Sequence, residues 1–534
     1  MSRQRCPTFP TLGQAETALI DRTRKRQLFD ATSSANSGSI CVLNPLPVER
    51  WDDRAAAHLL NRAAFGATPE EIAVTKAKGL AGAVLDLVEP RVSALPFDPP
   101  DWAHPRDLRS LRQEARMAKQ NGDTTKIREV RKTEADEILD LRRWWMARMA
   151  TTAAPLLEKM TLFWHGHFAT SVEKVKDGYW MWLQNETIRR HALANFAALT
   201  KEMSRDPAMM IYLDLPQSRR EHPNENWARE LMELFTVGLG NYTEQDVRES
   251  ARAFTGYRLD LVTQRFWFAP NQYDAGPKTF LGRTGNFNGD DIIHFLTKQP
   301  ACAQFLAKKL CRFFIEEEPS PSLINAVAER LRAHDLEIKP VLREIFSSAE
   351  FYSDRVMRAQ IKSPTQFIIQ SCKLLSCDLP GPRVAQNAMR QMGQILFAPP
   401  NVKGWDGGKS WISTSTLLFR NNFANYLING DAILPPAMKR QGADVGFRGA
   451  ARAAFVDEIR RNPIDVNRLV SADVRNNAQR LIANLSKRVL QSDPPSDDMA
   501  AFTNFLAARK DDSSDATVRG LLHLMMSTPL YQLT

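Results

Sequence analysis

Two polar clusters lie within largely apolar, helix-like sequence, and they hold residue types that do acid–base chemistry or bind metal ions. The first is 164–168, which contains His165 and His167. The second is 224–235, which contains four charged residues: Glu225, Arg229, Glu230 and Glu233. Imidazole and carboxylate groups transfer protons and ligate metals, and a guanidinium binds anions. Because an unpaired polar group is costly to bury, both clusters are candidate site residues.

The first cluster has two interpretations. A helix over 156–171 has an apolar stripe that includes Met160, Trp164 and Phe168. On a continuous helix, His165 and His167 lie about 200° apart and do not share one metal ion. If the helix ends near Gly166, the two rings could converge. The alternative is a pair of core histidines with satisfied hydrogen bonds.

The second cluster predicts an amphipathic helix. The charged residues fall on one arc, and the opposite arc is apolar, with Trp227, Ala228, Leu231, Leu234 and Phe235. The polar arc either lines an internal cleft or faces solvent with an Arg229–Glu233 pair. A cleft would supply a general acid and base, or oxygen ligands for a divalent metal whose identity the sequence leaves unknown.

Two glycine-containing loops are further candidates. The segment 404–410 resembles a phosphate-binding loop, but only three residues separate Gly404 from Gly408, and no strand precedes it. It leads into a predicted helix over 415–427, whose free amides could bind an anion together with Lys403 or Lys409. The loop 274–282 places Asp274 and Lys278 near turn residues. Each loop could instead be purely structural.

The composition is that of a globular protein. The chain has 534 residues, of which 43% are hydrophobic and 25% charged. The net charge of +10 is spread over the whole length, so it permits an acidic partner but does not indicate nucleic acid. No apolar run is long enough to span a membrane, and the N-terminal sequence is not a secretory signal as written. The six cysteines form no Cys-x-x-Cys pair, which favours reduced thiols and a cytoplasmic location.

Periodicity predicts a mainly α, large multi-helix globular protein with few or no short strands. Helix starts are marked at Thr68, Thr243 and Ser363, each followed by a side chain that suits a capping motif. A short strand over 262–268 is the exception. We expect a poorly ordered N-terminal extension over 1–50, a helical core over 51–430 and a C-terminal helical segment over 431–534.

Several motifs, in order, resemble one bacterial family, the domain-of-unknown-function 1800 family. They are 58–66 (HLLNRAAFG), 160–168 (MTLFWHGHF), 224–238 (NENWARELMELFTVG), 242–247 (YTEQDV), 255–257 (TGY), 278–282 (KTFLG) and 399–408 (PPNVKGWDGG). The resemblance runs from about residue 51 to the end. It implies a mainly helical fold and no assigned activity. Many members are encoded beside a sulfatase-like protein, which is therefore a candidate partner, and many carry export signals. The family often has His-Asp where this chain has Tyr273-Asp274.

The leading functional hypothesis is an enzyme, a hydrolase or transferase, with a polar cleft built from His165, His167, Glu225, Arg229, Glu230 and Glu233. Histidine would act as base, a glutamate as acid or metal ligand, and Arg229 as an anion clamp. The alternative is a non-catalytic helical protein that acts with the sulfatase-like partner, in which the same groups form a buried structural network.

Overall fold

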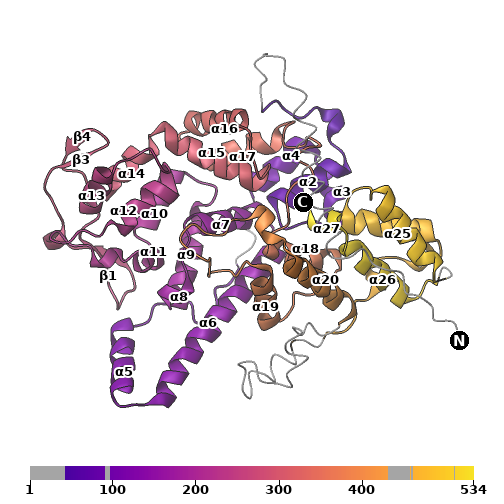
Figure 1. Cartoon of the computed structure of the whole chain (residues 1–534), viewed down its shortest axis with the longest axis horizontal. Coiled ribbons are helices and arrows are strands. Elements are labelled where there is room, and N and C mark those ends of the chain that lie inside the picture. Colours follow the sequence, from indigo (N-terminus) through magenta and orange to yellow (C-terminus); the bar gives the residue numbers. More distant parts are fainter. Residues whose placement is uncertain (1–42, 91–96, 431–457, 459–460, 510–511) are drawn as a thin grey trace. The chain divides into compact units, whose positions relative to one another are not determined.

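A computed structural model of the chain describes residues 43–90, 97–430, 458, 461–509 and 512–534 (Figure 1). Helices dominate these residues, and the strands form only two short antiparallel pairs, so the predicted mainly α fold is confirmed. The chain forms two compact units. The first contains the chain up to Ala83, Ala349–Gln394 and Gly407–Thr534; the second contains Val84–Ser348 and Ile395–Asp406. Helix α4 (Gly79–Val88) crosses from one to the other.

The second unit carries both polar clusters. Its α-helices are α5 (Leu108–Gln120), α6 (Thr124–Thr151), α7 (Pro155–His167), α8 (Val172–Val175), α9 (Gly178–His191), α10 (Phe196–Ser204), α11 (Pro207–Tyr212), α12 (Glu225–Glu230), α13 (Glu244–Ala253), α14 (Gly289–Thr297), α15 (Pro300–Phe314), α16 (Pro321–Ala333) and α17 (Ile338–Ser347). Local signals start several of them. Proline is the first residue of α7, and Thr243 forms the expected capping box with Asp246 at the start of α13.

The short strands lie between α13 and α14. Strand β1 (Tyr257–Leu259) pairs with β2 (Phe266–Phe268), which lies within the predicted 262–268 strand. Strands β3 (Lys278–Phe280) and β4 (Arg283–Gly285) form a hairpin in the stretch predicted to be a loop. Its turn is made by Leu281 and Gly282, both with positive φ, as a two-residue hairpin turn requires. Such short strands lack the long alternation on which a sequence prediction depends.

A buried carboxylate joins three helices of this unit. Glu158 of α7 accepts hydrogen bonds from Trp145 Nε1 (2.9 Å) and Arg148 Nε (2.7 Å) on α6, and from Arg189 Nε (2.6 Å) on α9. Its side chain is 1% exposed. Burial raises the pKa of Glu158, but the two arginines and Trp145 outweigh it, and the net pKa lies below its usual value. The carboxylate is therefore charged in the fold and fixes α7 against α6 and α9.

The first unit is built around α18 (Pro364–Leu374), a helix that is buried along almost its whole length. The other helices are α2 (Asp53–Ala63), α3 (Pro69–Ala77), α19 (Pro382–Met392), α20 (Thr414–Asn429), α23 (Ala472–Arg475), α24 (Ala478–Leu485), the π-helix η9 (Ser486–Leu490), α25 (Ser496–Ala507), α26 (Asp515–Met526) and α27 (Pro529–Gln532). The capping box of Thr68 and Glu71 starts α3, and Ser363 accepts a hydrogen bond from Gln366 N at the start of α18.

The chain ends contribute to this unit. The Tyr531 hydroxyl lies 2.7 Å from Ser371 Oγ on α18, and Lys362 Nζ donates to Tyr531 O at 2.6 Å. Most of the predicted extension 1–50 lies outside the described residues, as does 431–457 of the predicted C-terminal segment. The described end of the extension packs on the unit, since Leu46 is buried and Asn44 O accepts from Ala349 N.

Within the described part of the chain, no helix combines the length and the apolar character that a membrane crossing requires.

We predict that Glu158→Gln lowers the free energy of unfolding by about 3 kcal/mol or more, because it removes the fully buried carboxylate that pairs with Arg148 and Arg189. Glu186→Gln is the matched control: Glu186 also pairs with Arg189 (2.5 Å), but its side chain is 26% exposed. That change should cost less than about 1 kcal/mol. Urea unfolding followed by tryptophan fluorescence measures both. Equal losses in the two variants would contradict the assigned role of Glu158.

Candidate functional site

Helix α7 ends with the two histidines, and they point to different neighbours. The helix ends at His167, one residue after Gly166, and is capped by Phe168. His165 Nε2 accepts a hydrogen bond from Phe397 N at 3.1 Å, in the segment Ile395–Asp406. His167 instead contacts the segment that follows α12. The two rings do not converge, as expected for residues two apart on a helix.

His165 holds the loop that contains Pro399 and Trp405. Its ring packs against the rings of Trp145, Phe397 and Trp405, with centroids 5.0–5.6 Å away. Burial lowers the pKa of His165 to about 3, so the ring is neutral. A neutral ring that accepts at Nε2 carries its proton on Nδ1.

Several further contacts fasten this loop to the same unit. Phe397 has a positive φ of 61°, and its carbonyl accepts from Val172 N at 2.9 Å. Arg142 Nε donates to Leu396 O at 2.9 Å. Gly404 (φ +86°) lies so close to α7 that a Cβ there would come within 2.2 Å of Gly166 O. Glycine is required at position 404 on both grounds, the backbone conformation and the close approach.

His167 caps the helix of the second cluster. After α12 the chain continues as the π-helix η5 (Leu231–Thr236). His167 Nε2 donates to Phe235 O at 3.0 Å, and Lys309 of α15 donates to His167 Nδ1 (3.0 Å) and to Leu234 O (3.2 Å). These donors satisfy the carbonyl groups that a helix end leaves unpaired.

Burial and the nearby Lys309 ammonium keep the pKa of His167 well below its usual value. Burial also lowers the pKa of Lys309 to about 8. Lys309 was not among the predicted site residues. In the sequence, Lys309 stands out only as a lysine four residues after Phe305 in a helix whose other face is apolar. This pattern is a weak indication of a functional residue.

The predicted division of the second cluster into polar and apolar arcs is seen in the burial of most of its residues, but Leu234 of the apolar arc is only half-buried. Trp227, Ala228, Leu231 and Phe235 are buried, whereas Glu225, Arg229, Glu230 and Glu233 are half-buried. Arg229 pairs with Glu225 (3.2 Å) and, through two hydrogen bonds of 2.8 Å, with Glu244 of α13. The expected Arg229–Glu233 pair is not formed. The change from α- to π-helix after Glu230 alters the spacing that would have aligned these two side chains.

The carboxylates Glu230 and Glu233 lie in one electrostatic group. Burial raises the pKa of Glu230, and the negative charge of Glu233 raises it further, while Arg229 and Lys403 oppose the shift. The Tyr242 hydroxyl donates to Glu233 Oε2 at 3.2 Å. Burial and Glu233 together raise the pKa of Tyr242 to about 12, so its hydroxyl keeps its proton.

The structure separates the two predicted site motifs at the level of side chains. The histidines hydrogen-bond the main chain at Phe397 and Phe235, and the charged side chains of α12 and η5 interact with Arg229, Tyr242 and Glu244. The link between the motifs is the backbone of η5. Among the described residues, no group of three or more His, Cys, Asp or Glu side chains is placed to hold a metal ion.

The two predicted anion-binding lysines lie in different units. Lys403 is exposed and its positive charge acts on Glu230. Lys409 lies in a 3-10 helix, Gly408–Trp411, of the first unit. The predicted helix that follows is α20 (Thr414–Asn429), whose first turn is capped by Ser413 through Thr416 N.

The loop with Tyr273 and Asp274 is held by structural contacts. Asp274 forms two hydrogen bonds with Arg252, at 2.7 and 3.2 Å, and these help to lower its pKa against the effect of burial. Lys278 Nζ donates to Asp274 O at 2.6 Å and lies 5.0 Å from the Tyr273 ring centroid. Tyr273 itself donates to Phe287 O at 3.1 Å.

A family model described as a protein of unknown function, DUF1800, matches residues 58–533. The chain belongs to this family. The match includes both histidines, the helix pair α12–η5 and the loop around Gly404. No curated protein and no solved structure matches this DUF1800 chain.

The buried histidines of this DUF1800 protein predict a specific pH dependence. His165 binds a proton at an ordinary pKa near 6.5 when unfolded, but only near pH 3 when folded. Between these values the unfolded state holds more protons, so its contribution to stability is complete above pH 6.5 and falls by about 1.4 kcal/mol per unit as the pH decreases.

The matched variant is His165→Gln, whose amide oxygen can replace the Nε2 acceptor without titrating. Between pH 6.5 and 5, the free energy of unfolding of this variant should fall less steeply with decreasing pH than that of the wild type. The difference in slope should be about 1.4 kcal/mol per pH unit, which corresponds to one proton. Urea titrations at each pH, followed by tryptophan fluorescence, measure both slopes. Parallel slopes would mean that His165 is protonated in the folded state.

Proposed function

We propose that the half-buried side chains on α12 and η5 form the active site of a hydrolase or transferase that uses general acid–base catalysis. Glu230 is the acid, Glu233 is the base, and Lys403 provides a nearby positive charge. The observation that carries the proposal is the raised pKa of Glu230, caused by burial and by the neighbouring charge of Glu233. Two carboxyl groups whose environments differ in this way are suited to opposite roles in proton transfer.

The surroundings of the two carboxyl groups support these roles. Tyr242 is hydrogen-bonded to Glu233 Oε2 and so fixes the orientation of this carboxylate. Burial, the charge of Glu173 and the charge of Glu230 raise the pKa of Tyr212 on α11. The site is thus flanked by tyrosine hydroxyls that can hydrogen-bond a polar substrate, and the exposed Lys403 can bind its negative charge.

The π-helix is a second supporting feature. A π-helix is rare, less stable than an α-helix, and found often at functional sites. Here Glu233 lies within it, between the buried residues Met232 and Phe235. In a regular α-helix, Glu233 would point toward Arg229. In the π-helix these two side chains do not pair.

The histidines take a different role from the one expected from sequence. Buried, neutral and hydrogen-bonded to the main chain, His165 and His167 are positioning residues. His167 secures the end of the helix that carries Glu233, and His165 secures the loop that carries Lys403. Arg229, engaged with two carboxylates, orients α12 against α13.

We predict that Glu230→Gln lowers turnover by about 10²–10⁴-fold, the usual contribution of a positioned general acid. Wild type, Glu230→Gln and the control Glu221→Gln are compared on a panel of chromogenic esters, glycosides and phosphate esters. Glu221 is an exposed carboxylate paired with Arg220 (3.0 Å) and lies just before α12. Glu221→Gln should retain the wild-type rate.

Equal rates for wild type and Glu230→Gln on every substrate would contradict the enzymatic proposal. The second candidate, a non-catalytic protein that acts with a sulfatase-like partner, would then be favoured. The observation in its favour is that the ring nitrogens His165 Nε2, His167 Nδ1 and His167 Nε2 all have protein partners, so these contacts need no ligand. Coexpression and co-purification with the neighbouring sulfatase-like protein would test that role.

A further inference from the structure

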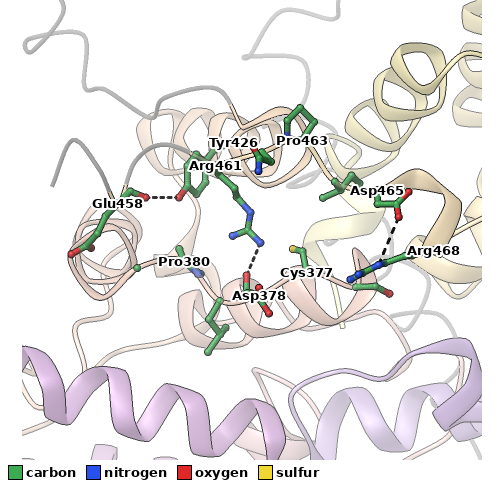
Figure 2. A pocket seen from close by; sticks show the side chains of 14 residues that line it. Cys377, Asp378, Pro380, Tyr426, Glu458, Arg461, Pro463, Asp465 and Arg468 are labelled. Atoms are coloured by element: carbon green, nitrogen blue, oxygen red, sulfur yellow. Dashed lines mark hydrogen bonds and ion pairs between the residues drawn. The ribbon is translucent and has the colours of Figure 1, made fainter. Parts of the chain in front are cut away.

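A polar pocket in the first unit is lined by one cysteine, Cys377, which follows the buried Cys372 by five residues. The pocket has a volume of about 580 Å³ and lies between the segment 376–381 after α18, Tyr426 of α20 and the segment 461–468. Figure 2 shows the Cys377 side chain at its wall, next to Asp378. Cys377 is partly exposed, while Cys372 behind it is buried.

The C-terminal cap of α18 brings these two thiols together. Cys377 N donates to Cys372 O at 3.0 Å, and Ser376 N donates to Lys373 O at 3.1 Å. Ser376 has a positive φ of 50°. This pair of bonds, with the left-handed Ser376, is the Schellman motif, which commonly brings together the side chains at the positions held here by Cys372 and Cys377. The thiols share a hydrogen bond.

The two thiols differ in reactivity. The hydrogen bond from Cys372 lowers the pKa of Cys377, and the Arg461 guanidinium lowers it further against the effect of burial. The same hydrogen bond, together with burial, raises the pKa of Cys372. A partly exposed thiol with a lowered pKa beside a buried second thiol is the arrangement of a nucleophile and a resolving cysteine.

The charged residues of the pocket indicate what it can bind. Arg461 donates to Asp378 O at 2.7 Å, and Arg468 lies 3.8 Å from Asp465 (Figure 2). Glu458 also lines the pocket. Cationic and anionic groups therefore face the same space, and this suits a small molecule that carries both ammonium and carboxylate groups.

We propose that this pocket is a thiol–disulfide exchange site for a small zwitterionic disulfide, with Cys377 as the attacking thiol and Cys372 as the resolving thiol. This inference is independent of the function proposed for α12 and η5.

The exchange is balanced in two steps. Cys377 loses its proton to solvent and attacks one sulfur of the substrate R–S–S–R; the S–S bond breaks, and one RS⁻ leaves and takes up a proton. Cys372 then loses its proton and attacks the Cys377 sulfur, and the second RS⁻ leaves and is protonated. Two cysteine thiols are oxidised to one disulfide, and one small disulfide is reduced to two thiols.

Peptide mapping of the full-length protein tests the proposal. The reduced protein is freed of reductant without oxygen, treated with oxidised glutathione, alkylated with N-ethylmaleimide, digested and analysed by mass spectrometry. We expect a Cys372–Cys377 disulfide and a minor glutathione adduct on Cys377. Cys302 and Cys311 are internal controls, since both are buried and burial raises the pKa of each to about 12. They should react at least about tenfold more slowly.

Two variants separate the roles of the thiols. In Cys372→Ser the glutathione adduct on Cys377 should accumulate, because no thiol resolves it. In Cys377→Ser, Cys372 should remain unmodified over the same time. Modification of Cys372 first, or modification of Cys377 no faster than of Cys302 and Cys311, would overturn the proposal. The relative rates at which the four cysteines are modified are measured on the wild-type protein, so this test stands even if a variant does not fold.

Two further reagents test the class of substrate. Hydroxyethyl disulfide is uncharged, so it should form the Cys372–Cys377 bond at least about tenfold more slowly than oxidised glutathione, after correction for their rates with free cysteine. Equal corrected rates would overturn the assignment of a zwitterionic substrate. Formation of the bond with hydrogen peroxide but not with oxidised glutathione would overturn disulfide exchange.

Discussion

A buried imidazole must be neutral, and a neutral imidazole has one donor and one acceptor nitrogen. Helix α7 ends in two such rings, and each binds the main chain of a different segment. His165 accepts from Phe397 N in the loop that contains Gly404, and His167 donates to Phe235 O at the end of η5. The positions of both segments therefore depend on the end of one helix. Glu158, nearer the start of the same helix, fixes it to α6 and α9 through Arg148 and Arg189.

This arrangement separates positioning from chemistry. The imidazoles of His165 and His167 are buried and hydrogen-bond the main chain, and His167 also accepts from the Lys309 side chain. The groups left half-buried are two carboxylates and a tyrosine, Glu230, Glu233 and Tyr242, and the nearby Lys403 is exposed. Burial keeps the histidines neutral, and partial burial on another helix raises the pKa of Glu230.

Sequence patterns predicted the helices and the polar arc of α12, because apolar spacing and capping residues are local signals. The capping boxes at Thr68 and Thr243 formed as expected. Three features were not predictable in this way. Because η5 is a π-helix, the Arg229–Glu233 pair does not form. The hairpin of β3 and β4 is too short to show alternation of polar and apolar residues. Lys309, which donates to His167, lies 142 residues away from it in sequence. Each depends on packing between distant segments rather than on local preference.

The pairing of Cys372 with Cys377 was also not predictable from the sequence. Cys372 and Cys377 are not spaced as a Cys-x-x-Cys motif, and the sequence gives no reason to connect them. The left-handed residue Ser376 ends α18 in a geometry that places them in contact.

His165 and His167 are neutral in this structure and serve as hydrogen-bonding partners of the main chain. Nitrogen-15 NMR of the histidine-labelled protein, with His165→Gln and His167→Asn for assignment, tests it directly. We expect that neither ring takes up a proton between pH 8 and 5, that His165 carries its proton on Nδ1 and that His167 carries its proton on Nε2. Titration of either ring near pH 6.5, or the opposite tautomer, would contradict it.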